Sequence, residues 1–197
     1  MELISRVMDI YSHIDHEVAA FQLKTGLRCP TGCGACCSSQ TVAATVVEML
    51  PAAHEILCRG EAGRHIALLE KEQDEDRICV FYQKDLPADA AGHCGMYALR
   101  PAVCRLFGFT AIRDRLSALK LAACRHLKQI DPKAVHRASK HQTQAPCYGH
   151  YGTALIALDI QNHHPLPINT ALYQAIMRIG LNMQISHSQM LGSATAA

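Results

Sequence analysis

Apolar residues recur at intervals of three and four along most of the chain, which is the spacing of one face of an α-helix. The first such segment runs from Leu3 to Phe21, and Gly26 follows at the place where a helix would end. Asp131 and Pro132 form a helix-start signal, because an aspartate can cap a first turn and proline fits its first position. The same reasoning predicts helices over residues 61–76, 114–130, 132–144, 151–162 and 169–184. The pattern therefore indicates a mainly α-helical fold.

Several stretches depart from this helical pattern. Residues 29–39 read CPTGCGACCSS, in which Gly, Pro and Ser disfavour regular structure and let the backbone wrap closely around a ligand. Residues 41–60 predict a short extended piece that passes into a helix interrupted at Pro51. Residues 78–82 form a short β-prone run, and Pro101 suits the first turn of a further helix. These stretches place irregular segments between the predicted helices.

Composition and charge exclude several functions. The chain of 197 residues is long enough to bury a core without help from a metal. Its net charge of +2, without a basic stripe, gives no reason to expect nucleic-acid binding. No apolar stretch approaches the roughly 20 residues of a membrane span, and the first residues lack the apolar run of a signal peptide. We therefore expect a cytoplasmic protein that binds neither nucleic acid nor a membrane, and whose partner is another protein.

Ten cysteines are the unusual feature of the composition. Thiols stay reduced in the cytosol, so metal binding or redox chemistry is favoured over a disulfide framework. Cys29, Cys33, Cys36 and Cys37 form C-x3-C-x2-C-C, and the two-residue spacer lets two sulfurs face one point, as at zinc and iron–sulfur sites. Adjacent side chains in loop backbone are expected to point apart. We therefore expect that Cys36 and Cys37 do not bind the same zinc ion.

Four further cysteines lie downstream at wider spacings, and eight thiols suffice for two four-sulfur sites or for one site plus redox-active thiols. The candidate metal ligands are Cys29, Cys33, Cys36, Cys37, Cys79, Cys94, Cys104 and Cys124. Cys58 and Cys147 stand in no comparable setting and are interpreted as structural or surface thiols. The expected fold is thus a single irregular helical domain whose cysteine-rich loops are organised around a metal centre.

These cysteines resemble the signature of a bacterial cysteine-cluster family, the putative zinc- or iron-chelating domain proteins. The resemblance rests on residues 29–37, on residues 79–81, on the run CGMYALRPAVCR over 94–105, and on Cys124. It implies metal binding and specifies no reaction. We expect an N-terminal helix over 1–28, a metal-binding domain over 29–130, a C-terminal helical extension packed on it over 131–190, and a disordered tail over 191–197.

An iron–sulfur cluster is the preferred cofactor, and Zn²⁺ is the alternative. Structural zinc usually shows two separate C-x2-C knuckles, whereas this chain has one, from Cys33 to Cys36. Arg100 and Arg105 flank Cys104 and could supply the positive surroundings that cluster sulfurs favour. The alternative for both arginines is an ion pair with a helix carboxylate such as Glu48. The sequence predicts a protein that transfers electrons or assists a partner enzyme, or else a zinc-stabilised binding module without redox activity.

Two enzyme classes share single features with the chain. The spacing Cys29-x3-Cys33-x2-Cys36 is that of radical-SAM enzymes, but the residues that follow lack the alternating strands and helices of their barrel. A zinc hydrolase needs three ligands and a nearby carboxylate base, and no H-E-x-x-H motif is present. His126, two residues after Cys124, is the histidine placed best to reach the metal site. Whether the protein is an enzyme stays open at this stage.

Overall fold

A computed structural model describes residues 1–30, 33–34, 36–37, 39, 41–71, 78–84 and 92–194, with side chains described as far as Gln184. Eight α-helices occupy these residues, so the mainly α-helical prediction is confirmed. They are α1 (Glu2–Thr25), α2 (Val46–Cys58), α3 (Ala62–Lys71), α4 (Ala102–Leu106), α5 (Arg125–Ile130), α6 (Pro132–Lys140), α7 (Tyr148–Leu158) and α8 (Ile168–Ala194). Three short 3-10 helices accompany them: η1 (Tyr97–Leu99), η2 (Gln142–Gln144) and η3 (Ile160–Asn162).

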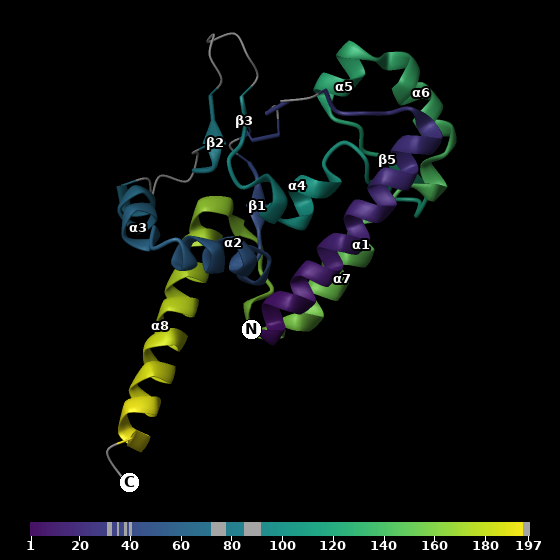
Figure 1. Cartoon of the computed structure of the whole chain (residues 1–197). Coiled ribbons are helices and arrows are strands. Elements are labelled where there is room, and N and C mark those ends of the chain that lie inside the picture. The colour runs from purple at the N-terminus through teal and green to yellow at the C-terminus, as the bar shows by residue number, and fades with distance from the viewer. Residues whose placement is uncertain are drawn as a thin grey trace.

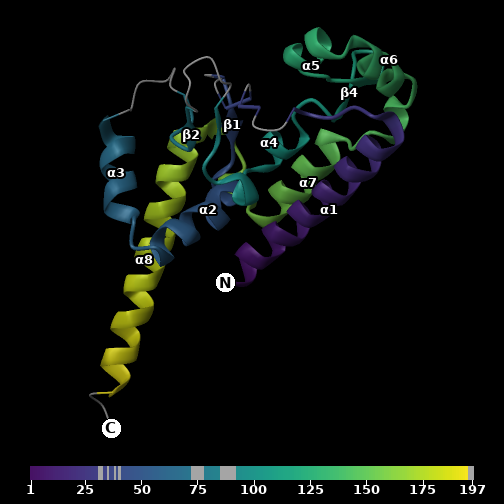
Figure 2. The same cartoon turned by 45° about the horizontal axis from the view of Figure 1, so that its top comes forward.

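Strands are short and pair two by two, always antiparallel. The pairs are β1 (Ala43–Ala44) with β6 (Leu166–Pro167), β2 (Tyr82–Gln83) with β3 (His93–Cys94), and β4 (Ala111–Arg113) with β5 (Leu119–Leu121). In space, α1 lies beside α7, while α2 packs across α8, whose C-terminal part extends beyond the body of the molecule (Figures 1 and 2). The short helix α4 lies between these two groups of helices (Figure 1). The strands thus connect and position helices and build no layer of their own.

Helix α1 follows the predicted apolar pattern. Its buried side chains, spaced by three and four residues, are Val7, Tyr11, Ile14, Val18 and Phe21. Gly26 ends the helix with φ 71°, a left-handed conformation that glycine adopts without a steric penalty. The predicted N-terminal helix is therefore confirmed, and its end delivers the chain to the first cysteine group.

Helix α2 continues through Pro51, so the predicted interruption is wrong. Its start is fixed by a capping box, in which Thr45 and Glu48 bond each other's backbone N–H groups. Proline removes one backbone hydrogen bond from a helix interior. That loss is offset by packing, because side chains such as Val47 and Met49 are fully buried in the core that α2 forms with α8.

The chain after residue 110 folds as a hairpin where the sequence predicts the start of a helix. In the turn, the Asp114 carboxylate accepts hydrogen bonds from the N–H groups of Leu116 at 2.9 Å and Ala118 at 3.0 Å. Ser117 takes a left-handed conformation with φ 62°. These local bonds compete with helix formation and favour a turn. The helical prediction is wrong over residues 114–124, and α5 begins only after them.

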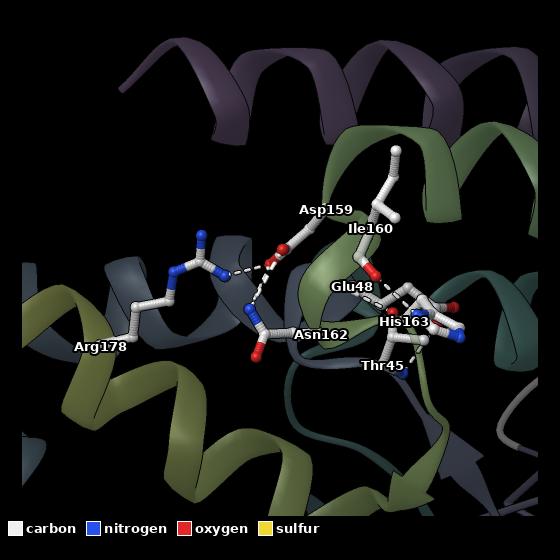
Figure 3. Close-up of polar contacts among 7 residues, drawn as sticks. All are labelled: Thr45, Glu48, Asp159, Ile160, Asn162, His163 and Arg178. Carbon is white, nitrogen blue, oxygen red and sulfur yellow. Dashed lines mark hydrogen bonds and ion pairs between the residues drawn. The ribbon is translucent and has the colours of Figure 1, made fainter.

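The later helices agree with prediction apart from their ends. The Asp131 side chain caps α6 by accepting from the Ala134 N–H at 2.8 Å. Helix α7 with η3 occupies the predicted 151–162 segment, and α8 covers 169–184 and continues to Ala194. Asp159, at the end of α7, pairs with Arg178 of α8 and accepts a hydrogen bond from Asn162 at 3.1 Å (Figure 3). This contact fixes the turn between the two helices.

One predicted strand is shorter in the structure than expected, and other predicted segments lie outside the described residues. The β-prone run at 78–82 supplies only Tyr82 to a strand. Residues 72–77, which include the end of the predicted 61–76 helix, residues 85–91, and residues 195–197 of the predicted disordered tail lie outside the described residues. Among the described residues, no helix has the length and apolar character needed to cross a membrane.

Candidate metal centre

A cavity of about 520 Å³ lies where the loop after α1, the β2–β3 pair, α4 and the start of α5 meet. The candidate cysteines all line it: Cys29, Cys33, Cys36, Cys37, Cys79, Cys94, Cys104 and Cys124. The fold therefore brings the two distant cysteine groups together. Within the described part of the chain, no three Cys, His, Asp or Glu side chains converge closely enough to hold one ion. The thiols surround a space larger than a single metal ion.

Local backbone structure presents each group of thiols. In the first loop, the Cys33 N–H donates to the Pro30 carbonyl at 3.1 Å and the Cys37 N–H to the Gly34 carbonyl at 2.8 Å, so two successive turns fold the loop back. Cys94 lies in β3 opposite Tyr82. Cys104 lies within α4, and Cys124 caps α5, its sulfur accepting from a backbone N–H. The second group is thus held by regular elements and the first by turns.

Cys36 and Cys37 lie closer than their adjacency in sequence predicts. Their sulfur atoms are 3.9 Å apart, so the expectation that the two side chains point apart is wrong. The Gly34–Cys37 turn brings both sulfurs to one side. Sulfurs that share a tetrahedral zinc ion at about 2.3 Å lie about 3.8 Å apart. The observed distance therefore suits two thiolates on one metal ion.

Hydrogen bonds among the thiols also join the two groups. The Cys37 thiol forms hydrogen bonds with the sulfurs of Cys36 and Cys94. These bonds are the main cause that lowers the pKa of Cys36 to about 6 and that of Cys94 to about 7. The pKa of Cys37, as the donor, is raised correspondingly. Burial raises the pKa of Cys29 and of Cys79 to about 12. The cavity lining thus includes two cysteines whose pKa is lowered, Cys36 and Cys94, beside others whose pKa is raised.

The two arginines beside Cys104 have different roles. Arg100 lines the cavity and stacks on Tyr97, with its guanidinium carbon 3.9 Å from the ring centroid. Arg105 turns the other way: its Nε donates to the Arg100 carbonyl at 2.9 Å, and its terminal nitrogens donate to Ala98 and Asp15. Its carboxylate partner is therefore Asp15 of α1, where the sequence suggested Glu48. Of these two arginines, only Arg100 is among the described residues that line the cavity.

Glu48 has a positioning role that the sequence interpretation missed. Its carboxylate is buried and accepts from the Thr45 N–H at 2.8 Å and the Thr45 hydroxyl at 2.9 Å (Figure 3). It also accepts from the N–H groups of Ala102 and Val103, the first residues of α4. The T-x-x-E motif of the capping box can be read from the sequence. The hydrogen bonds from α4 to the Glu48 carboxylate cannot, because they depend on tertiary structure. Glu48 thereby ties the helix that carries Cys104 to α2.

The walls of the cavity include residues far from the cysteine motifs. Val18 and Gln22 come from α1, and Ile168 comes from the start of α8. Apolar side chains complete the lining: Val42, Phe81, Phe107, Phe109 and Leu127. An apolar wall lowers the polarity around a bound group and limits the access of water. Apart from Phe81, which belongs to the 79–81 run, no sequence motif marks these residues, because their role depends on how the helices pack.

A second, open cleft of about 550 Å³ shares Phe107 and Cys124 with the cavity. His126 lies in this cleft, with Arg125 and Gln129 of the same helix. Among the described lining residues of the cysteine cavity, neither His126 nor Cys58 nor Cys147 appears. Cys58 is exposed at the end of α2, where its sulfur lies 3.6 Å from a ring nitrogen of His54.

Fold and cavity together define a helical protein built around a cysteine cluster. The model of the CxxCxxCC family, described as a putative zinc- or iron-chelating domain, matches residues 28–132. This match covers more than half of the chain and all eight cysteines of the cavity, so the chain belongs to this family and has a metal-binding role. No curated protein and no solved structure matches the chain.

Proposed function

We propose that the cavity holds an iron–sulfur cluster and that the protein transfers electrons or assists a partner enzyme in the cytoplasm. The observation that carries the proposal is the convergence of eight cysteines, from segments up to 95 residues apart in sequence, on one cavity of about 520 Å³. Soft thiolate ligands favour zinc, copper(I) or iron–sulfur clusters over hard cations. The ligands would come from Cys29, Cys33, Cys36, Cys37, Cys79, Cys94, Cys104 and Cys124.

The size of the cavity favours a centre with several metal atoms over one ion. A single zinc ion needs four ligand atoms at roughly 2.0–2.3 Å around one point. The described thiols instead line a broad space without three ligand groups converging on one point. In a two-iron cluster with four cysteines, each iron takes two thiolates, which suits the 3.9 Å between the Cys36 and Cys37 sulfurs. The cluster would supply one-electron chemistry when bound.

The residues of the chain would set the surroundings of that group. The wall formed by Phe81, Phe107 and Phe109 would exclude water. Arg100 would supply positive charge next to the thiolates. Cys36 and Cys94 already favour the thiolate form that a metal requires. The remaining thiols would release their protons as the metal binds.

A zinc-stabilised binding module is the second candidate, and one observation favours it. The Cys36 and Cys37 sulfurs have the separation of two ligands on one tetrahedral zinc ion, and Cys94 is hydrogen-bonded to the same pair. Small movements would bring three thiolates around one ion. In that case the metal would stabilise the cysteine-rich part and carry no electrons.

Metal analysis of anaerobically purified protein separates the two candidates. The cluster predicts a coloured protein that contains iron and acid-labile sulfide in similar amounts, and a reversible one-electron reduction. A colourless protein with zinc and no sulfide would reject the cluster and favour the zinc module.

Matched cysteine variants test the cavity itself. Cys104→Ser removes a cavity thiol and is expected to reduce the metal content, whereas Cys58→Ser makes the same chemical change at an exposed cysteine away from the cavity. Equal metal content in both variants would show that Cys104 is no ligand.

A further inference from the structure

We propose that Arg100 donates a hydrogen bond from its Nε–H group to a sulfur atom of the bound metal centre. This inference rests on the proposed function, in that the cavity must hold a metal group. The Nε atom of Arg100 is buried and has no hydrogen-bond partner in the described part of the chain. Buried donors in folded proteins are almost always paired, so an unpaired one calls for an explanation. A sulfur of a metal group in the cavity that Arg100 lines would be its acceptor.

Contacts on both sides of Arg100 hold it in place. Its guanidinium lies 3.9 Å from the centroid of the Tyr97 ring, a cation–π contact. Its backbone carbonyl accepts a hydrogen bond from Arg105 at 2.9 Å, and Arg105 is itself anchored to Asp15 of α1. The following residue, Pro101, restricts the backbone further. Arg100 is therefore positioned at the cavity before any ligand binds.

The charge of Arg100 already acts on cysteines of both groups. The hydrogen bond with Cys37 has the largest effect on the pKa of Cys36 and of Cys94 and lowers both values, whereas burial raises them. The positive charge of Arg100 also lowers the pKa of both cysteines. Burial raises the pKa of Cys104, and Arg100 opposes this rise. Arg100 thus lines the cavity within electrostatic reach of thiols on three different segments. Its fixed, planar N–H donors suit a hydrogen bond to one metal-bound sulfur better than a mobile ammonium would.

The test compares five variants of the full chain, each loaded with metal anaerobically: Arg100→Gln, Arg100→Lys, Arg28→Gln, Tyr97→Leu and Tyr97→Phe. Residues that hydrogen-bond metal ligands typically contribute about 10- to 100-fold to metal affinity. Arg100→Gln is therefore expected to release metal to a chelator about 10- to 100-fold faster than wild type. Arg100→Lys keeps the charge and should recover little of this loss. If the group is a cluster, its reduction potential should also fall, because positive charge and a hydrogen bond favour the reduced form.

Arg28→Gln is the matched control. Arg28 lines the same cavity and carries the same charge, but it is exposed, so its replacement should change the release rate less than twofold. Tyr97→Leu removes the stacking partner at a side chain that is 62% exposed, so the fold should tolerate it. It should accelerate release part of the way towards Arg100→Gln, whereas Tyr97→Phe should behave as wild type.

The outcomes that overturn the inference differ from those that overturn the proposed function. A wild-type protein without bound metal rejects the proposed function. Normal metal content with unchanged release in both Arg100→Gln and Tyr97→Leu rejects only the role of Arg100. Equal effects of Arg100→Gln and Arg28→Gln, with full recovery in Arg100→Lys, would mean that charge alone matters and would also reject the hydrogen bond.

Discussion

At the scale of single residues, Glu48 is a buried carboxylate whose charge depends on the pH. Only 4% of the residue is exposed, and burial raises its pKa above the ordinary 4.5, against the hydrogen bonds from Thr45, Ala102 and Val103. The folded protein therefore holds the Glu48 proton more tightly than the unfolded chain does. Its contribution to the free energy of unfolding is fully present below the ordinary pKa and is lost as the pH rises through the raised value.

Two substitutions of Glu48 test this role. Glu48→Ala leaves the Thr45 and α4 N–H donors without their acceptor and should lower the free energy of unfolding by about 2–4 kcal/mol. Glu48→Gln keeps an acceptor and cannot ionise, so its stability relative to wild type should improve as the pH rises from 4.5 towards neutrality. Urea unfolding at several pH values measures both effects. Parallel pH curves for wild type and Glu48→Gln would show that the carboxyl keeps its ordinary pKa.

Cys124 should react faster than Cys79 in the metal-free protein. It borders both the cavity and the open cleft, whereas Cys79 is 7% exposed and has its pKa raised to about 12 by burial. Timed alkylation with peptide mass spectrometry should label Cys124 well before Cys79, with the exposed Cys58 as reference. Bound metal should protect Cys124 and leave Cys58 unchanged. Equal labelling of Cys124 with and without metal would remove it from the ligand set.

Some features of the candidate site can be predicted from the sequence, and others depend on tertiary structure. The eight cysteines of the cavity were predictable, because their spacings and the R-P-x2-C-R run mark them without tertiary information. The sulfur contact of Cys36 and Cys37 was not, because it depends on a turn closed by a backbone hydrogen bond from Cys37 to Gly34. The opposite orientations of Arg100 and Arg105 depend likewise on Asp15, about 90 residues away in sequence.

At the scale of elements, α4 is held to α1 through Arg105, which is buried with 4% of its side chain exposed. Losing the buried Arg105 is costly, because the carbonyls of Ala98 and Arg100 then lose their charged donor. Arg105→Gln should lower the free energy of unfolding by about 3 kcal/mol or more. Asp15→Asn should cost about 1 kcal/mol or less, since half of the Asp15 side chain is in solvent.

The control for this prediction is Arg59→Gln. Arg59 pairs with Glu55 on the surface of α2, where both side chains are exposed, so its loss should change stability little. Chemical denaturation of the three variants gives the order directly. An Arg105→Gln protein as stable as Arg59→Gln would show that α4 does not depend on this anchor.

The elements also show where periodicity is a sufficient guide and where it is not. Helix α1 was predictable because its buried residues keep one spacing and Gly26 supplies an end signal. The β4–β5 hairpin was not, because Leu116 and Leu119 imitate a helical face while the Asp114 side chain fixes a turn. Helix α2 continues through Pro51 because its burial against α8 outweighs the backbone hydrogen bond that proline removes. Local hydrogen bonds in a turn thus explain why the helix predicted over 114–124 is absent, and tertiary packing explains why α2 continues through Pro51.

At the scale of the whole molecule, the cavity is built at the edge of a core that does not depend on it. Fully buried side chains outside the cavity lining, such as Val7, Ile14, Met49, Leu172 and Ile176, join α1, α2 and α8. Val18 and Ile168 belong to the same core and also line the cavity. Helices α1 and α8, outside the family match, therefore supply both core packing and part of the cavity wall.

This arrangement predicts a partial response to metal removal. Chelation should loosen the first cysteine loop, β3 and the start of α5, because thiolate ligands would join these segments. Helix α4 should loosen less, because Glu48 and Arg105 also hold it. Helices α1, α2 and α8 should stay formed, since of the candidate ligands only Cys79 is a member of the apolar core, and the other buried side chains that join these helices bind no metal. Hydrogen exchange should therefore show lost protection around Cys94 and Cys124, and retained protection around Ile14 and Leu172. Loss of all far-ultraviolet helical signal on chelation would contradict this division and would mean that the metal holds the whole fold together.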